Sequence, residues 1–92
     1  MAEDPPVDEH ADDDAELVEL VDYLARCLVD APDEVRVDAV EEDRSIVLEL
    51  SVAPDDLGKV IGKDGRTARA MRTLLAATSA RQRRRAVLDI LE

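Results

Sequence analysis

Aromatic side chains are almost missing from this sequence of 92 residues, which has no tryptophan, no phenylalanine and one tyrosine, Tyr23. Proteins that bind single-stranded nucleic acids often stack the bases on aromatic rings. A single tyrosine excludes a stacking surface of that kind. Any contact that this chain makes with a base must therefore come from aliphatic or polar groups.

Cysteine and histidine are also scarce, with one of each. A lone Cys27 excludes a disulfide within the chain, so we expect a reducing compartment. The histidine, His10, lies in an acidic N-terminal stretch, and no Cys–His, Ser–His or paired-carboxylate set can be assembled elsewhere. We therefore predict a protein that is not an enzyme and that has no metal site and no cofactor.

Long apolar runs are missing as well. None approaches the roughly 20 residues that a membrane-spanning helix needs, and the acidic N-terminus is unlike a signal peptide. We expect a cytoplasmic protein with one domain, whose small core uses nearly all of the chain that follows the N-terminal stretch.

The charged residues are unevenly divided along the chain, whose net charge is −11. Residues 1–56 hold 20 acidic and 3 basic side chains, a net charge of −17, whereas residues 57–92 hold 3 acidic and 9 basic ones, a net charge of +6. Nucleic-acid-binding domains gather their basic residues on one part of the surface. The second part of the chain is therefore where we expect a surface for a polyanion.

The N-terminal part predicts a tail followed by a helix. Residues 1–13 are rich in proline and acid and show no apolar period, so we expect a disordered tail there and a folded domain at 14–92. The helix is predicted at 15–29, with Asp14 as its N-cap and Pro32 after its end. Cys27 adjoins its apolar stripe and is expected to be buried. The stripe consists of Leu17, Leu20, Val21, Leu24 and Leu28.

Two strands follow this helix. Val35 and Val37 alternate with charged residues and predict a strand that ends near Val40, and residues 41–44 form a polar turn. From Ile46 to Val52, an apolar residue at every second position predicts a strand with one buried face. The short turn joins the two strands into an antiparallel hairpin.

The last part of the chain predicts two helices and a strand. Pro54 and Asp55 suit the start of a short helix, which a loop with two glycines separates from a longer helix at 66–80. Residues 81–85 form a basic link to a strand at 86–91. The order helix, strand, strand, helix, helix, strand predicts an α+β fold, with the helices packed on one face of a three-stranded sheet. In the longer helix we expect Ala70, Met71, Leu74 and Leu75 to point inward.

The loop between the last two helices is Gly62-Lys63-Asp64-Gly65. Neither glycine carries a Cβ, so the backbone can turn sharply and approach another molecule closely. The helix that follows offers its first N–H groups to a negative oxygen, and Lys63 adds a positive charge at the tip. Asp64 is expected to cap that helix. These features predict a site for a phosphodiester backbone.

The stretch from Val60 to Arg66 resembles the Gly-x-x-Gly loop of KH domains, which clamps about four single-stranded nucleotides. The order of predicted elements resembles the bacterial (type II) arrangement, α-β-β-α-α-β, with a KH core at about 43–92. The length is similar to that of small single-KH RNA-binding proteins of the KhpA type, and the resemblance covers 15–92. One departure is that Thr67 and Ala68 stand where KH helices usually place a large aliphatic residue.

Residues and resemblance together predict a single-stranded RNA-binding protein. Loop amides and Lys63 would hold phosphates, and an aliphatic floor for bases would come from Val60 and Ile61 with the edge of the second strand. The resemblance implies an RNA chaperone or post-transcriptional regulator that is homodimeric or paired with a larger KH-containing protein, and a link to cell-wall biogenesis and cell shape. The predicted RNA-binding residues are Lys59, Val60, Ile61, Gly62, Lys63, Asp64, Gly65, Arg66 and Arg69.

Other interpretations of the same residues fit less well. A plain helix–helix turn is disfavoured by two glycines around a lysine, with Val60-Ile61 before them and arginines after them. A helix-turn-helix DNA reader fits the flanking strands less well than a KH domain. A nucleotide-binding P-loop is excluded, because it needs four residues between its glycines and a Ser or Thr after the lysine. A KH fold that mainly dimerises stays open as a second hypothesis, favoured by the missing aromatic residues, the acidic first half and Asp64. Residues 81–85 could be a solvated link, a phosphate track or a contact to an acidic second copy.

Overall fold

A three-stranded sheet forms the frame of the computed structural model, which describes residues 11–82 and 84–92. The strands are β1 (Arg36–Glu41), β2 (Ser45–Ser51) and β3 (Arg85–Ile90), in the order β1-β2-β3. β1 and β2 form the predicted antiparallel hairpin, whereas β2 and β3 are parallel. A parallel pair requires a crossover connection, and α2 (Leu57–Ile61) and α3 (Arg66–Ala80) supply it.

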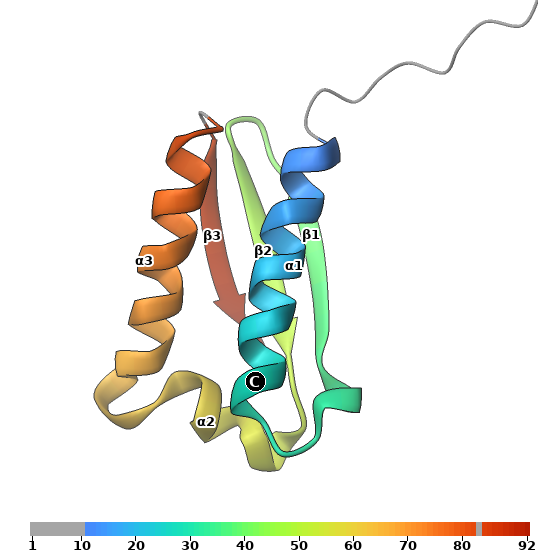
Figure 1. Ribbon diagram of the computed structural model, residues 1–92, viewed down its shortest axis with the longest axis vertical. Coiled ribbons are helices and arrows are strands. Elements are labelled where there is room, and N and C mark those ends of the chain that lie inside the picture. Colours follow the sequence, from blue (N-terminus) through green and yellow to red (C-terminus); the bar gives the residue numbers. More distant parts are fainter. Residues whose placement is uncertain (1–10, 83) are drawn as a thin grey trace, which may run out of the picture.

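The helices α1 (Ala11–Leu28) and α3 lie next to each other on one face of the sheet (Figure 1). The predicted α+β architecture with type II KH order is therefore confirmed. α2 and the glycine loop lie at one end of the molecule, and the α3–β3 link lies at the other. None of the helices in the described part of the chain combines the length and apolar character needed to cross a membrane. The described residues also include three short 3₁₀ turns, at Pro32–Glu34, Pro54–Asp56 and Lys63–Gly65.

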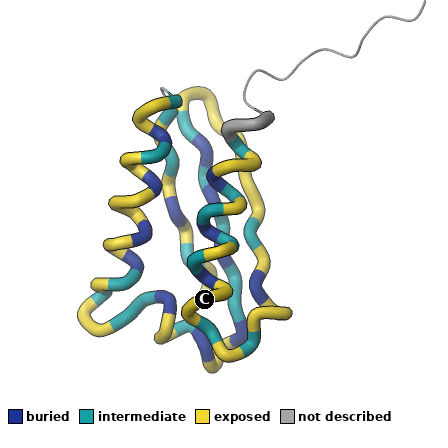
Figure 2. The backbone as a smooth tube through the Cα atoms, viewed as in Figure 1, coloured by how far each residue is buried: buried dark blue, intermediate teal, exposed yellow. Residues whose placement is uncertain are grey.

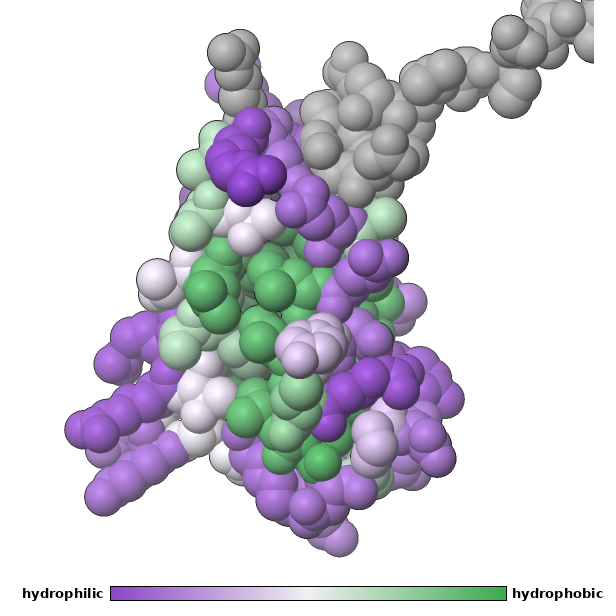
Figure 3. Space-filling view, viewed as in Figure 1, coloured by the Kyte–Doolittle hydropathy of each residue, from purple (hydrophilic) through white to green (hydrophobic). Residues whose placement is uncertain are grey.

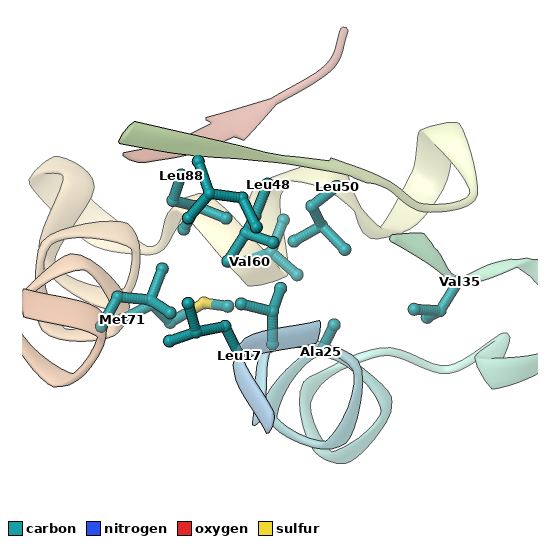
Figure 4. Close-up of a cluster of buried hydrophobic side chains, with 11 residues drawn as sticks. Leu17, Ala25, Val35, Leu48, Leu50, Val60, Met71 and Leu88 are labelled. Carbon is teal, nitrogen blue, oxygen red and sulfur yellow. The ribbon is translucent and has the colours of Figure 1, made fainter. Parts of the chain in front are cut away.

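The core lies between the sheet and the two long helices. On β2, Ile46, Leu48 and Leu50 are completely buried and alternate with residues that are partly exposed, as the sequence predicts. Buried positions of α1 and α3 face this strand (Figure 2). Burying an aliphatic side chain of this size contributes about 1.5–3 kcal/mol. Figure 4 shows the cluster, which also includes Leu17, Val21, Ala25, Val35, Val60, Met71, Leu75 and Leu88.

The ends of several elements differ from those predicted. α1 begins at Ala11 rather than at residue 15, so residues 11–13 of the predicted disordered tail are helical. The other ten residues of that tail, with His10, lie outside the described residues. Each strand is displaced by one residue from its predicted range, whereas α3 has the predicted bounds. Such shifts are expected because hydrophobic alternation fixes the faces of an element more closely than its ends.

The inward face of each long helix also differs in part from the prediction. In α1, Ala25 is buried, whereas Leu28 is 38% exposed and Cys27 is exposed, so the predicted burial of Cys27 is wrong. In α3, the predicted inward positions Ala70 and Leu74 are exposed. The reason is that apolar residues occupy two adjacent stripes of α3, and only one of them can face the sheet. The stripe that does so is Ala68, Met71, Leu75 and Ser79.

One residue of the basic link is part of the fold. The Arg84 side chain is only 7% exposed and forms ion pairs with Asp14 on α1 and with Glu41 on β1, the latter at 3.1 Å. Next to it, the Gln82 side-chain amide donates a hydrogen bond to Glu16. The link is therefore held to the acidic half of the same chain. Two of the roles considered for residues 81–85 are therefore excluded for Arg84: it is not a solvent-exposed linker residue, and its guanidinium is not free to bind phosphate.

We predict that Arg84→Met lowers the free energy of unfolding by about 1–2 kcal/mol, because two partly exposed carboxylates lose a nearly buried partner. The matched variant Arg85→Met alters an exposed neighbour and should change it by less than about 0.5 kcal/mol. Urea denaturation of both variants measures the difference. Equal effects of the two substitutions would contradict the structural role of Arg84.

Candidate nucleic-acid interface

The glycine loop reverses the chain between α2 and α3 within four residues. α2 ends at Ile61, and the Gly62 N–H donates to the Gly58 carbonyl at 2.8 Å. Gly62 then takes φ 78° and ψ 170°, a conformation open essentially to glycine alone. Asp64 and Gly65 follow with φ 58° and 73°, both left-handed. The loop therefore ends with its backbone turned directly into the first residue of α3.

The two loop glycines are needed for different reasons. A Cβ on Gly62 would lie 2.2 Å from Oγ1 and 2.8 Å from the backbone nitrogen of Thr67, so the first turn of α3 occupies that space. A Cβ on Gly65 would meet no heavy atom within 4 Å. Gly62 thus fixes the packing of the loop against α3. Gly65 supplies its left-handed conformation and leaves open space beside the backbone.

Asp64 does not cap α3, so the capping prediction is wrong. The N-cap residue of α3 is Gly65, which has no side chain with which to cap the helix. Asp64 lies one residue too early and is the one non-glycine among the described residues with positive φ, a conformation that aspartate tolerates better than most residues. The first amide of α3, that of Arg66, already donates to the Lys63 carbonyl. Since no side chain caps α3, the amides that follow Arg66 in the first turn remain available to an anion.

Basic residues follow the loop along one flank of α3. Lys63, Arg66 and Arg69 are exposed, and no ion pair between described residues includes any of them. One turn further, the Arg72 guanidinium donates a hydrogen bond to the Leu88 carbonyl of β3 at 3.4 Å. This contact shows that the basic flank of α3 borders β3. Long hydrophilic side chains extend from this side of the molecule in Figure 3.

The opposite flank of α3 is apolar and borders α1. Leu74 follows Arg72 by two residues, which places it about 200° further around the helix. Its side chain is 47% exposed, and Ala70 and Ala77, one turn to either side, are also exposed. Figure 3 shows an apolar area between the two long helices on this face. α3 therefore separates Arg72 from Leu74, whereas Ala70 lies one turn after Arg66 on the same side of the helix.

The structure supports only part of the predicted floor for bases. Val60 is completely buried and belongs to the core, whereas Ile61 is partly exposed beside the loop. The second strand cannot contribute an edge, because β2 is the central strand and pairs on both sides; that part of the prediction is wrong. The sequence showed the strand but not its position in the sheet. The strand that borders the basic flank is β3.

Lys59 takes part in a network that ties α2 to the end of α1. Its ammonium group lies 2.8 Å from an Asp30 carboxylate oxygen and 3.0 Å from one of Asp56. The Asp56 side chain, 3% exposed, also accepts hydrogen bonds from the Asp30 and Ala31 backbone amides at 3.2 and 3.0 Å. The hydrogen bond from Lys59 lowers the pKa of Asp56, and the hydrogen bond to Asp30 raises the pKa of Lys59.

Asp56 was not among the predicted functional residues, although it fixes the start of the helix that carries the loop. A carboxylate that follows Pro54 and Asp55 was the available signal. In sequence, however, it could not be told from an exposed first-turn acid. Lys59, by contrast, was predicted to flank the RNA path. The structure places it next to two carboxylates instead of leaving it free.

Alanine substitutions at three glycines distinguish the stability cost of a steric clash from that of a strained backbone conformation. Gly62→Ala should lower the free energy of unfolding by about 2–4 kcal/mol, since it combines backbone strain with a clash against Thr67. Gly65→Ala should cost about 1–2 kcal/mol through its left-handed conformation alone. Gly58→Ala, inside α2 with open space around it, should raise stability by about 0.5–1 kcal/mol. Thermal and urea denaturation measure all three, and a Gly62 variant as stable as the Gly65 variant would contradict the packing role.

The chain is similar to known proteins over most of its length. Residues 18–90 match the family described as KhpA/KhpB, KH domain. A protein named RNA-binding protein KhpA from Halalkalibacterium halodurans is 52% identical over 73 residues, which cover 79% of this chain and 96% of that protein. Proteins with the same name from Aquifex aeolicus and Mycobacterium bovis are 50% and 51% identical, over 83% and 82% of this chain and 96% and 94% of theirs. The chain therefore belongs to the KhpA/KhpB family of KH-domain proteins.

Proposed function

We propose that this protein binds single-stranded RNA through the loop at 62–65 and the basic flank of α3. The observation that carries the proposal is the juxtaposition of three exposed cations with a helix start that no side chain caps. The names of the related KhpA proteins, which are RNA-binding proteins rather than enzymes, support it. We therefore assign the protein a binding function and no catalysis.

The loop and α3 would bind different phosphates of the RNA. The amides at the start of α3 and the Lys63 ammonium bind one phosphate, and the open space beside Gly65 lets the backbone come close. Arg66 and Arg69 then meet the following phosphates along the flank that borders β3. Ile61 offers the aliphatic contact to a base. Because this set contains no aromatic platform, we expect little preference for base identity.

Two predicted residues would act indirectly. Val60 supports the loop from the core and does not reach a base without rearrangement. Lys59 would contact phosphate only by leaving Asp30, whose side chain is 82% exposed. At the tip, Asp64 repels phosphate, which restricts the approach of RNA to the side of the loop that carries Lys63 and Arg66.

We further propose that the protein forms a homodimer, or pairs with a larger KH-containing protein, through the apolar flank of α3. One KH groove contacts only about four nucleotides and is expected to bind weakly, and two linked grooves gain by effective concentration. Leu74 lies about 140° around α3 from Arg69, whereas Ala70 lies one turn after Arg66 on the same side. A dimer contact centred on Leu74 would therefore leave the Arg69 side of α3 accessible to RNA.

The cellular role that fits these properties is that of a cytoplasmic RNA chaperone or post-transcriptional regulator. The family membership and the small size support it, as does a groove with few means of base discrimination. A link to cell-wall biogenesis and cell shape remains part of the same proposal. The alternative, a KH fold that dimerises with little RNA binding, is favoured by one observation, the exposed carboxylate of Asp64 at the loop tip.

The loop is tested by Lys63→Asp, which replaces the cation at the tip by a second carboxylate. We expect RNA binding to be lost with an unchanged melting temperature, because Lys63 is exposed and is not part of the core. Arg44→Asp, an identical change of charge in the exposed hairpin turn, should retain RNA binding. Titration of a single-stranded RNA oligonucleotide at several salt concentrations measures the effect. Unchanged binding by the Lys63 variant would favour the dimerisation alternative.

The dimer is tested by Leu74→Glu, which places a charge on the apolar flank of α3. Sedimentation equilibrium at micromolar concentration should give a dimer for the parent and a monomer for this variant. Leu91→Glu, at a residue with a similar exposed fraction of 41%, should leave the dimer intact. The monomeric variant should bind a long RNA more weakly than the parent but a four-nucleotide RNA equally well. A parent that is strictly monomeric and still binds RNA tightly would contradict the proposal.

A further inference from the structure

The face of the sheet that lies away from α1 and α3 is a second organised surface. Side chains alternate between the two faces of a strand. Since Ile46, Leu48 and Leu50 point into the core, Val47 and Glu49 point to the opposite face. Figure 1 shows that both long helices lie on the core side. We call the opposite surface the open sheet face.

Two rows of like residues cross the open sheet face. Strand register pairs Glu49 with Asp38 on one side and with Asp89 on the other. It pairs Val47 with Val40 and Val87 in the same way. The first three residues form an acidic row, and the three valines form a valine row next to it. Val40 is 42% exposed and Val87 is 36% exposed, so the valine row is accessible.

The acidic row is unfavourable within the folded chain. Neighbouring strands lie about 4.8 Å apart, and like charges directly opposite each other destabilise a sheet. No ion pair between described residues includes Asp38, Glu49 or Asp89. The described residues also contain no group of three or more acidic, cysteine or histidine side chains arranged to hold a metal ion. Among the residues that the structure describes, the row therefore has no ion-pair partner and does not form part of a metal-binding group.

We propose that the open sheet face is a docking surface for a cationic amphipathic helix of a partner protein. The three carboxylates of the acidic row are complementary to lysine or arginine, and the valine row beside them is complementary to aliphatic side chains. RNA is excluded as the occupant because three carboxylates repel phosphate. A second copy stacked by this face is disfavoured because each acidic row adds to the negative field of the other.

The spacing of the rows fits a helix that lies across the strands. Successive carboxylates are about 4.8 Å apart, and one helical turn rises about 5.4 Å. Basic residues at positions i, i+4 and i+7 of the partner would thus lie over the acidic row. The two rows are two residues apart along each strand, or about 6.7 Å. Aliphatic residues on the adjoining stripe of the same helix would then meet the valine row.

The experiment uses the full chain and one defined probe, a fluorescent 14-residue helical peptide of leucine and lysine (LKKLLKLLKKLLKL), at 0.15 M salt. The face variant is Asp38→Asn, Glu49→Gln and Asp89→Asn combined. A matched control, Asp33→Asn, Glu34→Gln and Asp43→Asn combined, likewise neutralises two aspartates and one glutamate, at exposed positions away from the face. Fluorescence anisotropy measures the dissociation constant of each protein.

We expect the face variant to bind the peptide about tenfold more weakly, as for the loss of three exposed ion pairs, and the control to change by less than about twofold. The face variant should also melt at the same temperature or higher, since its row no longer repels itself. Equal losses in both variants would show that only net charge attracts the peptide and would overturn the proposal. So would an unchanged affinity in the face variant.

Amide chemical-shift mapping of the parent with the peptide locates the site directly. The proposal expects the largest shifts on the three strands and small ones at residues 62–69. The reverse pattern would overturn it. Lys63→Asp should leave peptide binding intact. The test of the docking surface is therefore independent of whether the loop binds RNA.

Discussion

The burial of the inner face of β2 is the interaction on which the rest of the structure depends. Ile46, Leu48 and Leu50 are completely buried beneath α1 and α3, and β2 is also the strand with which both β1 and β3 pair. Removing these side chains from water is the main favourable contribution available to a domain of this size. Because β2 leads into α2, whose Val60 joins the same cluster, the core also determines where the glycine loop emerges.

The fold places basic and acidic side chains on two different surfaces. The loop and the outer flank of α3 hold Lys63, Arg66 and Arg69, whereas the open sheet face holds a row of carboxylates. An overall charge of −11 therefore coexists with a local cationic surface. Exposed charges more than about 8 Å apart are largely screened at physiological ionic strength, so RNA at the loop would respond mainly to the nearby cations.

Two charged residues that could have served RNA instead hold the fold together. Arg84 joins the α3–β3 link to α1 and β1. At the other end of the molecule, Lys59 and the buried Asp56 join α2 to the end of α1. Both anchors secure connecting segments, and they lie at opposite ends of the molecule. They leave the arginines at the start of α3 as the cations whose position suits a phosphate chain.

The sequence by itself determined the order of the elements, the buried face of β2 and the site of the loop, because periodicity and paired glycines are local properties of the chain. Only the tertiary structure decided that β2 is central, that Val60 is buried and that Leu74 is exposed. Strand order and the choice between two apolar stripes on α3 depend on which distant surfaces meet. The same holds for Arg84, whose partners lie 70 and 43 residues away. Contacts between residues so far apart produce no periodic pattern in one sequence. The residues that make them can therefore be identified only in the folded chain.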